Sequence, residues 1–118
     1  MTPFNYLLAK DADEASALSI SNTKTKFLAG GTNLIDLMKE NVARPDTLID
    51  INKLAAFRSI TGHESGGLRL GALVKNADTA YDDRIQKRYP LLSQAILAGA
   101  SAQLRNMASN GGNLLQRT

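Results

Sequence analysis

The sequence predicts an α+β fold in which a small β-α-β-α-β subdomain is followed by the beginning of a second α/β subdomain. Short apolar stretches alternate with capped helical patterns over residues 1–52, an order that usually gives a small parallel sheet with covering helices. The composition changes at residues 53–58, and two strand-like stretches then flank a turn-rich segment. These observations place the first subdomain at residues 1–56 and the beginning of the second at residues 57–118.

The composition is that of a globular chain without a cysteine-based site. Its 118 residues lie within the usual size range of a single domain, and 43% hydrophobic residues are enough to build a core. The absence of cysteine excludes disulfides, thiolate metal sites and cysteine nucleophiles. The single histidine, His63, lies in a turn-like stretch with no second ligand spaced near it. We therefore expect no metal site and no catalytic residue in this chain.

The first subdomain is predicted from its apolar spacing and its helix caps. Residues 4–9 form an apolar stretch suited to a strand. Asp11 with Glu14 three places on resembles a capping box, which opens a helix over residues 12–20. Residues 26–29 then read as a brief buried strand that runs into a pair of glycines.

The next helix and strand complete the β-α-β-α-β order. Thr32 or Asn33 is placed to cap a helix. Its inward face would carry Leu34, Leu37 and Met38. Residues 47–51 form another β-like segment, which we expect to join the same sheet.

The second subdomain is predicted to begin with an antiparallel strand pair at residues 57–60 and 67–71. Asn76 or Asp78 is placed to cap a short helix. A longer helix follows Pro90, and its apolar residues recur on one face, so we expect this face to pack in the core. These residues are Leu91, Leu92, Ala95, Ile96 and Gly99.

The charge pattern argues against nucleic-acid partners, and the lengths of the apolar runs argue against a membrane partner. The formal net charge of +3 is compatible with an anionic ligand but is no nucleic-acid footprint. The densest basic stretch, residues 84–88, follows Asp82 and Asp83, and a solvated helix face explains it best. No apolar run approaches the roughly 20 residues of a membrane span, and no secretory signal is visible. We expect a cytoplasmic location by default; export to the periplasm with a signal-bearing partner stays open.

Residues 27–34 combine a strand, a glycine pair, a capping residue and a helix, which are the parts of an anion-binding turn. Glycines allow close backbone approach and positive φ, and a helix N-terminus offers unpaired N–H groups. The spacing of neither a Rossmann turn nor a P-loop is present. Taken alone, the pattern favours a capped strand-to-helix turn over a binding site.

A second glycine pair, Gly111 and Gly112, is compatible by itself with a turn between a helix and a strand. Ser109 lacks a nearby general base, and Asp50 lacks the paired arrangement needed for acid–base catalysis. The chain offers places to hold a phosphate-bearing ligand, and any reaction would be carried by that ligand.

Three separated blocks, read in one register, carry a family resemblance. They are AGGTNLIDLMK at residues 29–39, GGLRLGALVKNADTA at residues 66–80 and LAGASAQLRNMASNGGNLLQRT at residues 97–118. Together they resemble the FAD-binding subunit of the xanthine dehydrogenase family and, more narrowly, the medium, flavin-carrying subunit of bacterial molybdenum aldehyde oxidoreductases. The resemblance implies the N-terminal part of a vanillyl-alcohol-oxidase-like (PCMH-type) FAD-binding domain.

The resemblance also implies which residues hold the cofactor. A first loop wraps the FAD pyrophosphate with backbone N–H groups, and it is matched by Phe27, Leu28, Ala29, Gly30, Gly31, Thr32, Asn33 and Leu34. A second loop contacts the same dinucleotide, and it is matched by Ala108, Ser109, Gly111, Gly112, Asn113 and Leu114. Leu97 and Ala98 match a position that packs beside the flavin.

The chemistry implied by the resemblance is electron transfer through FAD. In this family a molybdenum-cofactor subunit oxidises the substrate, an iron–sulfur subunit relays electrons, and FAD passes them to an acceptor. Both subunits are therefore the expected partners. The family's flavin domain is longer than this chain, so the chain alone is expected to be inactive. The alternative is a truncated, non-catalytic interaction module that self-associates as a homo-oligomer and does not retain FAD.

Overall fold

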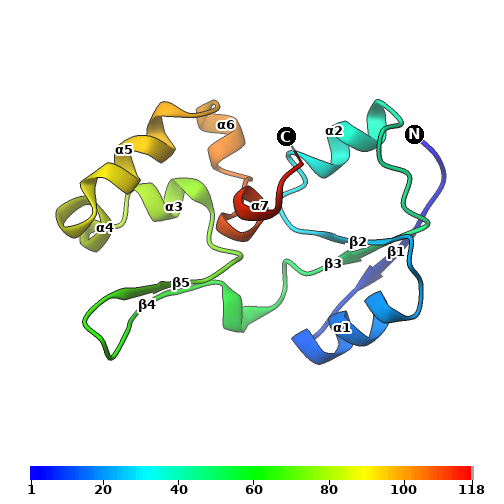
Figure 1. The fold of residues 1–118 in the computed structure, drawn as a ribbon, viewed down its shortest axis with the longest axis horizontal. Helices are drawn as coiled ribbons and strands as arrows, with labels where there is room; N and C mark the ends of the chain where they lie inside the picture. Colours follow the sequence, from blue (N-terminus) through cyan, green and yellow to red (C-terminus); the bar gives the residue numbers. More distant parts are fainter. Residues whose placement is uncertain (118) are drawn as a thin grey trace. The chain divides into compact units, whose positions relative to one another are not determined.

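The structure, a computed structural model, describes residues 1–117 and consists of two compact units (Figure 1). The first unit comprises Met1–Ala55 together with the residues from Gln116 onward, and the second comprises Ala56–Leu115. The first unit contains β1 (Asn5–Leu8), α1 (Ala12–Ile20), β2 (Thr25–Leu28), α2 (Leu34–Lys39) and β3 (Thr47–Asp50). The second contains β4 (Ile60–Gly62), β5 (Leu68–Leu70), α3 (Asn76–Ala80), α4 (Asp83–Arg88), α5 (Pro90–Ala98), α6 (Ala102–Arg105) and α7 (Asn110–Leu115). A 3-10 helix, η1 (Ala55–Phe57), spans the boundary.

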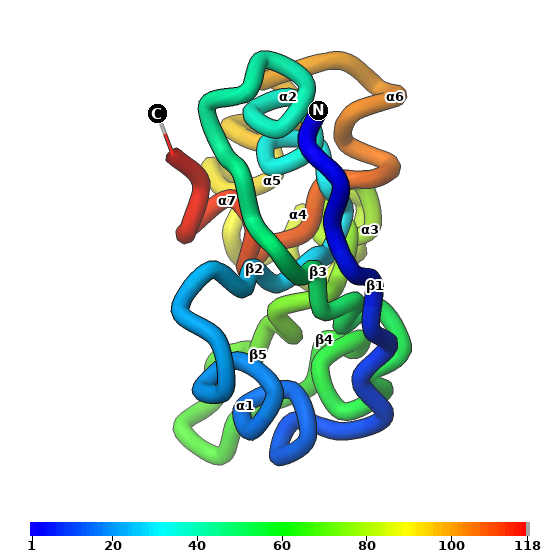
Figure 2. The backbone as a smooth tube through the Cα atoms, turned by 90° about the vertical axis from the view of Figure 1, so that its right-hand side faces the viewer, coloured from blue at the N-terminus to red at the C-terminus, as the bar shows by residue number. Residues whose placement is uncertain are grey.

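A three-stranded parallel sheet with strand order β1-β3-β2 forms the centre of the first unit (Figures 1 and 2). Both outer strands pair with β3 in register, so that Thr47 lies opposite a residue of each. Because β3 has a neighbour on either side, its apolar residues Leu48 and Ile49 are almost fully buried. Helices α1 and α2 cover opposite faces of this sheet, and their contributions to the core include Ala15 and Met38. The predicted β-α-β-α-β order is confirmed.

The predicted cap of α1 forms as expected. Asp11 Oδ1 accepts a hydrogen bond from the backbone N–H of Glu14 at 2.8 Å, which satisfies one of the donors that a helix N-terminus leaves unpaired. The Glu14 carboxylate accepts from the backbone N–H of Lys10 at 3.3 Å, one residue earlier than in a regular capping box.

The second unit begins with an antiparallel pair of β4 and β5, but the first strand lies later than predicted. Strand β4 begins at Ile60, and Phe57 belongs to the 3-10 helix. The reason is a close backbone approach beyond β5, where Leu73 donates to the Phe57 carbonyl at 2.9 Å. A Cβ atom on Gly71 would lie 2.3 Å from that same carbonyl oxygen, so only glycine fits there.

Helix α3 is found where a short helix was expected, but neither predicted residue caps it. Lys75 occupies the N-cap position without a side-chain cap bond, and Asn76 and Asp78 lie inside the helix. Asn76 is instead buried, and its backbone N–H donates to the Ala108 carbonyl at 2.9 Å. A backbone partner from a distant segment therefore replaces the local cap.

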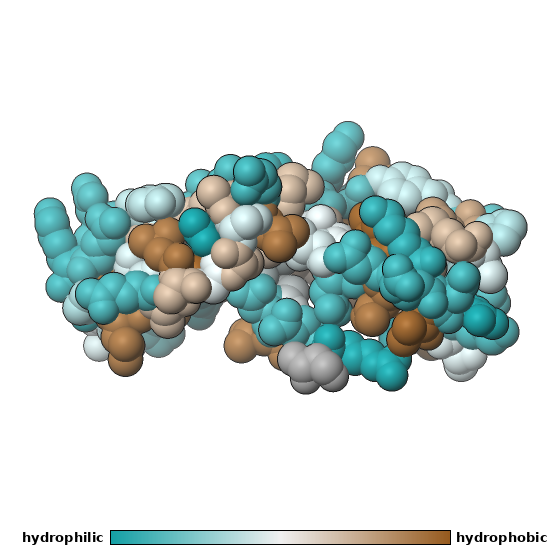
Figure 3. Space-filling view, turned by 90° about the horizontal axis from the view of Figure 1, so that it is seen from above, coloured by the Kyte–Doolittle hydropathy of each residue, from teal (hydrophilic) through white to brown (hydrophobic). Residues whose placement is uncertain are grey.

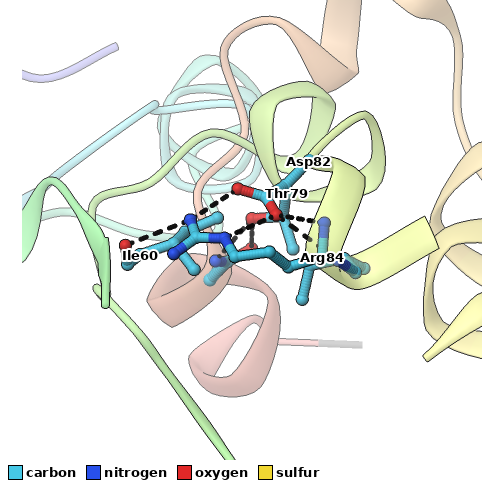
Figure 4. Close-up of polar contacts among 6 residues, drawn as sticks. Ile60, Thr79, Asp82 and Arg84 are labelled. Atoms are coloured by element: carbon cyan, nitrogen blue, oxygen red, sulfur yellow. Dashed lines mark hydrogen bonds and ion pairs between the residues drawn. The ribbon is translucent and has the colours of Figure 1, made fainter. Parts of the chain in front are cut away.

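Helix α4 is held by Asp82 and Arg84 (Figure 4). The Asp82 carboxylate caps the helix by accepting from the Arg84 backbone N–H at 2.9 Å, and it also binds the Arg84 guanidinium at 2.7 Å. The same guanidinium donates to the Ile60 carbonyl of β4 at 3.2 Å. Hydrogen bonding from the Arg84 side chain lowers the pKa of Asp82 from its ordinary 3.8 to about 2.

The prediction that the apolar face of α5 packs in the core is wrong. The buried residue of this helix is Ser93, whose hydroxyl donates to the Ala80 carbonyl of α3 at 2.7 Å. Leu91 is 77% exposed, and Leu92 is also exposed. The helix therefore turns its small, polar side toward α3, because a serine hydroxyl can satisfy a buried carbonyl there and a leucine cannot. Figure 3 shows apolar residues at the surface among hydrophilic ones.

Two kinds of feature are absent from residues 1–117. No helix in this range is long and apolar enough to cross a membrane. Nor does this range hold a group of three or more histidine, cysteine, aspartate or glutamate side chains arranged for a metal ion.

Replacing Asp11 should destabilise the first unit through loss of the α1 cap. We expect Asp11→Ala to lower the free energy of unfolding by about 1 kcal/mol. Asp13→Ala is the matched control, because Asp13 lies in the first turn of the same helix without forming the cap. Chemical denaturation of both variants is the measurement, and equal losses would contradict a capping role for Asp11.

The Asp82–Arg84 pair should make stability depend on pH in the acidic range. Because the pKa of Asp82 is lower in the folded protein than its ordinary 3.8, ionised Asp82 stabilises the fold above that value. This contribution is lost as the pH falls from about 3.8 to about 2. We expect Asp82→Asn to be less stable at neutral pH and to lose less stability across this window. Denaturation at several pH values measures the slope, and Asp83→Asn, which leaves the pair intact, should keep the wild-type slope.

Candidate functional site

The first glycine segment connects β2 to α2 at the carboxyl end of the sheet. Phe27 and Leu28 close the strand, the chain turns through residues 29–33, and Leu34 begins the helix. Gly31 has a φ of 77°, in the left-handed region that side chains disfavour. A Cβ atom there would also lie 2.6 Å from Ile35 Cδ1. The backbone angle favours glycine at this position, and a larger residue would also force the Ile35 side chain to shift.

This turn leaves consecutive backbone donors free. Within residues 1–117, the backbone N–H groups of residues 30–34 donate to no protein acceptor. The first N–H that does so is that of Ile35, which donates to the Gly31 carbonyl at 2.9 Å. Five adjacent free donors between a strand end and a helix N-terminus form a site suited to an anion.

Asn33 lies at the N-cap of α2 but does not cap it with its side chain. Its carboxamide instead holds the backbone of Arg117 at two points. The Nδ2 group donates to the Arg117 carbonyl at 3.2 Å, and Oδ1 accepts from the Arg117 N–H at 3.3 Å. The predicted side-chain cap is therefore wrong, because a distant backbone segment takes both hydrogen-bonding groups of the carboxamide.

Polar side chains from the other strands reach the same end of the sheet. Asn52 Nδ2 donates to the Ala29 carbonyl at 2.8 Å and to Asp50 Oδ1 at 2.9 Å. The second carboxylate oxygen of Asp50 accepts a hydrogen bond from the Tyr6 hydroxyl of β1. Partial burial raises the pKa of Asp50, but the hydrogen bonds from Tyr6 and Asn52 outweigh it and lower the pKa below its ordinary value. The same bond to Asp50 raises the pKa of Tyr6.

The second glycine segment opens with an extended pair of residues, Ala108 and Ser109, both of them buried. Ser109 forms an isolated antiparallel bridge with Lys75. The Lys75 ammonium also donates to the Met107 carbonyl at 3.0 Å. On the other side of the bridge, the Asn110 N–H donates to the Val74 carbonyl at 3.0 Å. Backbone pairing thus fixes where this segment starts.

Gly111 and Gly112 lie inside helix α7, so the expectation of a turn between a helix and a strand is wrong. The Gly111 N–H donates to the Ala72 carbonyl at 2.8 Å, and a Cβ atom on Gly111 would lie 3.0 Å from the Ala72 side chain. The Gly112 N–H donates to Ser109 Oγ at 3.3 Å. Gly111 therefore serves a close approach between α7 and the segment before α3, and the N–H groups of both glycines are already paired within the protein.

A side-chain pair also anchors α7. Thr79, which is fully buried in α3, exchanges hydrogen bonds with the Asn110 carboxamide at 2.8 and 3.1 Å. The remaining site residues of this helix, Asn113 and Leu114, are exposed, and Leu114 is 88% exposed. Helix α7 is thus fixed at its beginning and presents its later residues to solvent.

The other predicted site residues, Leu97 and Ala98, lie in the last turn of α5, a separate element. The residues that the sequence analysis missed are those that hold the two glycine segments in place. Asp50 and Asn52 were detectable in principle, because polar residues directly after a parallel strand lie at the sheet edge where ligands bind in open α/β sheets. Ala72 carries no such signal, since it acts through its carbonyl group alone.

Comparison with known families places this geometry in context. Residues 2–118 match the family described as the FAD binding domain in molybdopterin dehydrogenase. The chain is 48% identical over all of its 118 residues to the aldehyde oxidoreductase FAD-binding subunit PaoB of Escherichia coli (strain K12), and it covers 37% of that protein. It is 36% identical over 112 residues to the carbon monoxide dehydrogenase medium chain of Hydrogenophaga pseudoflava, covering 94% of this chain and 39% of the relative.

A solved structure shows the same fold. The carbon monoxide dehydrogenase from Hydrogenophaga pseudoflava, in a form that lacks the Mo-pyranopterin moiety of the molybdenum cofactor, superposes with a TM-score of 0.91 at 36% identity. The match covers 97% of this chain and 40% of that chain. The predicted α+β fold class is confirmed. The chain spans about two fifths of the length of these relatives.

Replacing Gly31 should destabilise the first unit. We expect Gly31→Ala to lower the free energy of unfolding by about 1–3 kcal/mol, because it adds both a strained backbone angle and a clash with Ile35. Gly66→Ala is the control: Gly66 has a φ of 88° but no atom within 4 Å of an added Cβ. This variant should suffer only the backbone strain, so chemical denaturation should show the smaller loss for Gly66→Ala.

Proposed function

The chain belongs to the family of FAD-binding domains of molybdopterin dehydrogenases, and from this we propose that it forms part of the flavin subunit of a molybdenum-containing hydroxylase or dehydrogenase. The observation that supports the proposal best is the run of five free N–H groups at residues 30–34. A dinucleotide carries a pyrophosphate, and a run of free backbone donors beside a helix N-terminus suits such an anion.

The residues present fit the pyrophosphate part of the cofactor. Gly31 adopts the positive φ of 77° that the turn needs to present consecutive backbone N–H groups. Residues 28–35 are all partly exposed, so this segment lies at the surface of the protein. Residues 25–35 include no acidic side chain, although Asp36 lies in the first turn of α2 and Asp50 ends β3 at the same edge of the sheet. The free backbone donors of this partly exposed segment therefore agree with FAD binding.

We assign FAD contacts to the segments that the family resemblance indicates. In the first unit they are Phe27, Leu28, Ala29, Gly30, Gly31, Thr32, Asn33 and Leu34. In the second unit they are Leu97, Ala98, Ala108, Ser109, Gly111, Gly112, Asn113 and Leu114. The two units would then correspond to the two FAD-binding subdomains. The paired N–H groups of Gly111 and Gly112 favour a supporting role for these glycines, and Gly111 allows α7 to approach Ala72 closely.

The protein's own contribution would be to bind and orient the cofactor. When bound, FAD supplies the ability to accept electrons singly and to pass on a pair. A molybdenum-cofactor subunit and an iron–sulfur subunit are the partners we propose. The 48% identity to an aldehyde oxidoreductase subunit favours an aldehyde as the substrate of the complex.

FAD binding is tested by placing a charge in the first glycine segment. We expect the purified protein to bind FAD saturably, as measured by quenching of flavin fluorescence. Thr32→Asp should weaken this binding by at least about tenfold, because a carboxylate would face the pyrophosphate. Thr32→Asn is the matched control of nearly equal shape without charge, and it should bind close to the wild-type protein.

A chimera makes the test independent of how much of the subunit is present. Residues 1–118 would replace the matching segment of the Escherichia coli FAD-binding subunit PaoB. A folded chimera that purifies without flavin and takes up none would contradict the proposal, whereas one that retains flavin and loses it on Thr32→Asp would support it.

A further inference from the structure

We infer that Asn52 is a positioning residue for the first glycine segment, which it holds in the binding conformation through the Ala29 carbonyl. This inference rests on the proposed function, since it concerns how the FAD-binding segment is kept in shape. Asn52 follows β3, whereas Ala29 follows β2, so the contact joins two adjacent strand ends. Its Nδ2 group lies 2.8 Å from the Ala29 carbonyl oxygen and 3.5 Å from that of Leu28.

The Ala29 carbonyl sets the direction of the Gly30 N–H. This carbonyl and the Gly30 N–H belong to one peptide group, which is planar, and all peptide bonds described here are trans. In a trans peptide the C=O and N–H bonds point in opposite directions. Holding the Ala29 oxygen toward Asn52 therefore points the Gly30 N–H away from Asn52. One side-chain hydrogen bond thereby sets the direction of the first of the five donors.

Asn52 is itself held in place from two sides. Its backbone N–H and its Nδ2 group both donate to Asp50 Oδ1, at 2.8 and 2.9 Å. The other oxygen of Asp50 accepts from the Tyr6 hydroxyl of β1. The carboxylate is thus fixed between β1 and Asn52, and both hydrogens of the Asn52 amide have acceptors. The resulting chain of hydrogen bonds runs from Tyr6 within β1 through Asp50 and Asn52 to Ala29, and it links β1 to the carboxyl ends of β3 and β2.

The side-chain chemistry at this position is specific. A carboxamide offers two donor hydrogens on one nitrogen, and here one serves the carboxylate of Asp50 and the other the carbonyl of Ala29. Alanine would remove both bonds. Aspartate has nearly the same shape, but when ionised it offers only acceptors and would face two further acceptors. Both substitutions should therefore release the Ala29 carbonyl.

The experiment compares Asn52→Ala and Asn52→Asp with Asn22→Ala. Asn22 is a matched control, because it also lies in the first unit, is also partly buried, and accepts one backbone hydrogen bond, from Lys24 at 2.9 Å. It precedes β2, at the opposite end of that strand from the glycine segment. We expect both Asn52 variants to bind FAD about five- to tenfold more weakly than the wild-type protein, and Asn22→Ala to bind unchanged.

A second measurement separates positioning from general destabilisation. In the protein without FAD, 15N relaxation order parameters of Gly30 and Gly31 should fall in both Asn52 variants, while those of β3 stay at wild-type values. Asn52→Asp keeps the shape of the side chain, so it serves the test even where Asn52→Ala does not fold.

The outcomes distinguish this inference from the proposed function. Unchanged FAD affinity and unchanged order parameters in the Asn52 variants would overturn the inference alone. The same would follow from an equal loss of affinity in Asn22→Ala. Absence of FAD binding in the wild-type protein would overturn the proposed function, and the order parameters would then still decide whether Asn52 fixes the segment.

Discussion

The pairing of β3 with both β1 and β2 is the constraint on which the candidate site depends. Because all three strands are parallel, their carboxyl ends meet at one edge of the sheet, and residues far apart in the chain come within hydrogen-bonding distance there. Burial of Leu48 and Ile49 of the central strand, on opposite faces of the sheet, stabilises this arrangement. The glycine turn after β2, the carboxylate that ends β3 and the tyrosine of β1 all take their positions from this pairing. The N–H groups free to bind an anion belong to a loop, but the strand pairing of the sheet determines their position.

In the second unit, backbone hydrogen bonds between two distant segments hold the second glycine pair in place. Residues 72–76 run beside residues 108–111, and successive bonds join Ala72 to Gly111, Val74 to Asn110 and Asn76 to Ala108. The missing side chain of Gly111 permits this approach, and the buried pair of Thr79 and Asn110 adds a specific side-chain contact. The glycine pairs of the two segments therefore differ in role. The N–H groups of the first pair are free, whereas those of the second pair donate to acceptors within the protein.

Much of the first unit could be predicted from the sequence. The strands, the α1 cap at Asp11 and the helix after the glycine pair all follow from patterns within a few residues of one another. Predictions for the second unit were weaker, because its elements are short and depend on distant partners. The face of α5 is an example: apolar spacing favoured burial of Leu91, but the helix packs through Ser93 because a carbonyl of α3 needs a donor there. Apolar periodicity shows which face of a helix is apolar, but it does not show which hydrogen-bonding groups a neighbouring helix presents to it.

The sequence by itself determined the fold class, the family and the segments that carry the two glycine pairs, because these rest on local order and on matches read in one register. Only the tertiary structure decided how the polar side chains are used. Asn33 binds the backbone of Arg117 instead of capping its own helix, and Asn52 reaches the carbonyl of Ala29 on the adjacent strand end. A carboxamide can bind either a local or a distant partner at similar energy, so the strand order and the path of the chain determine which partner it binds.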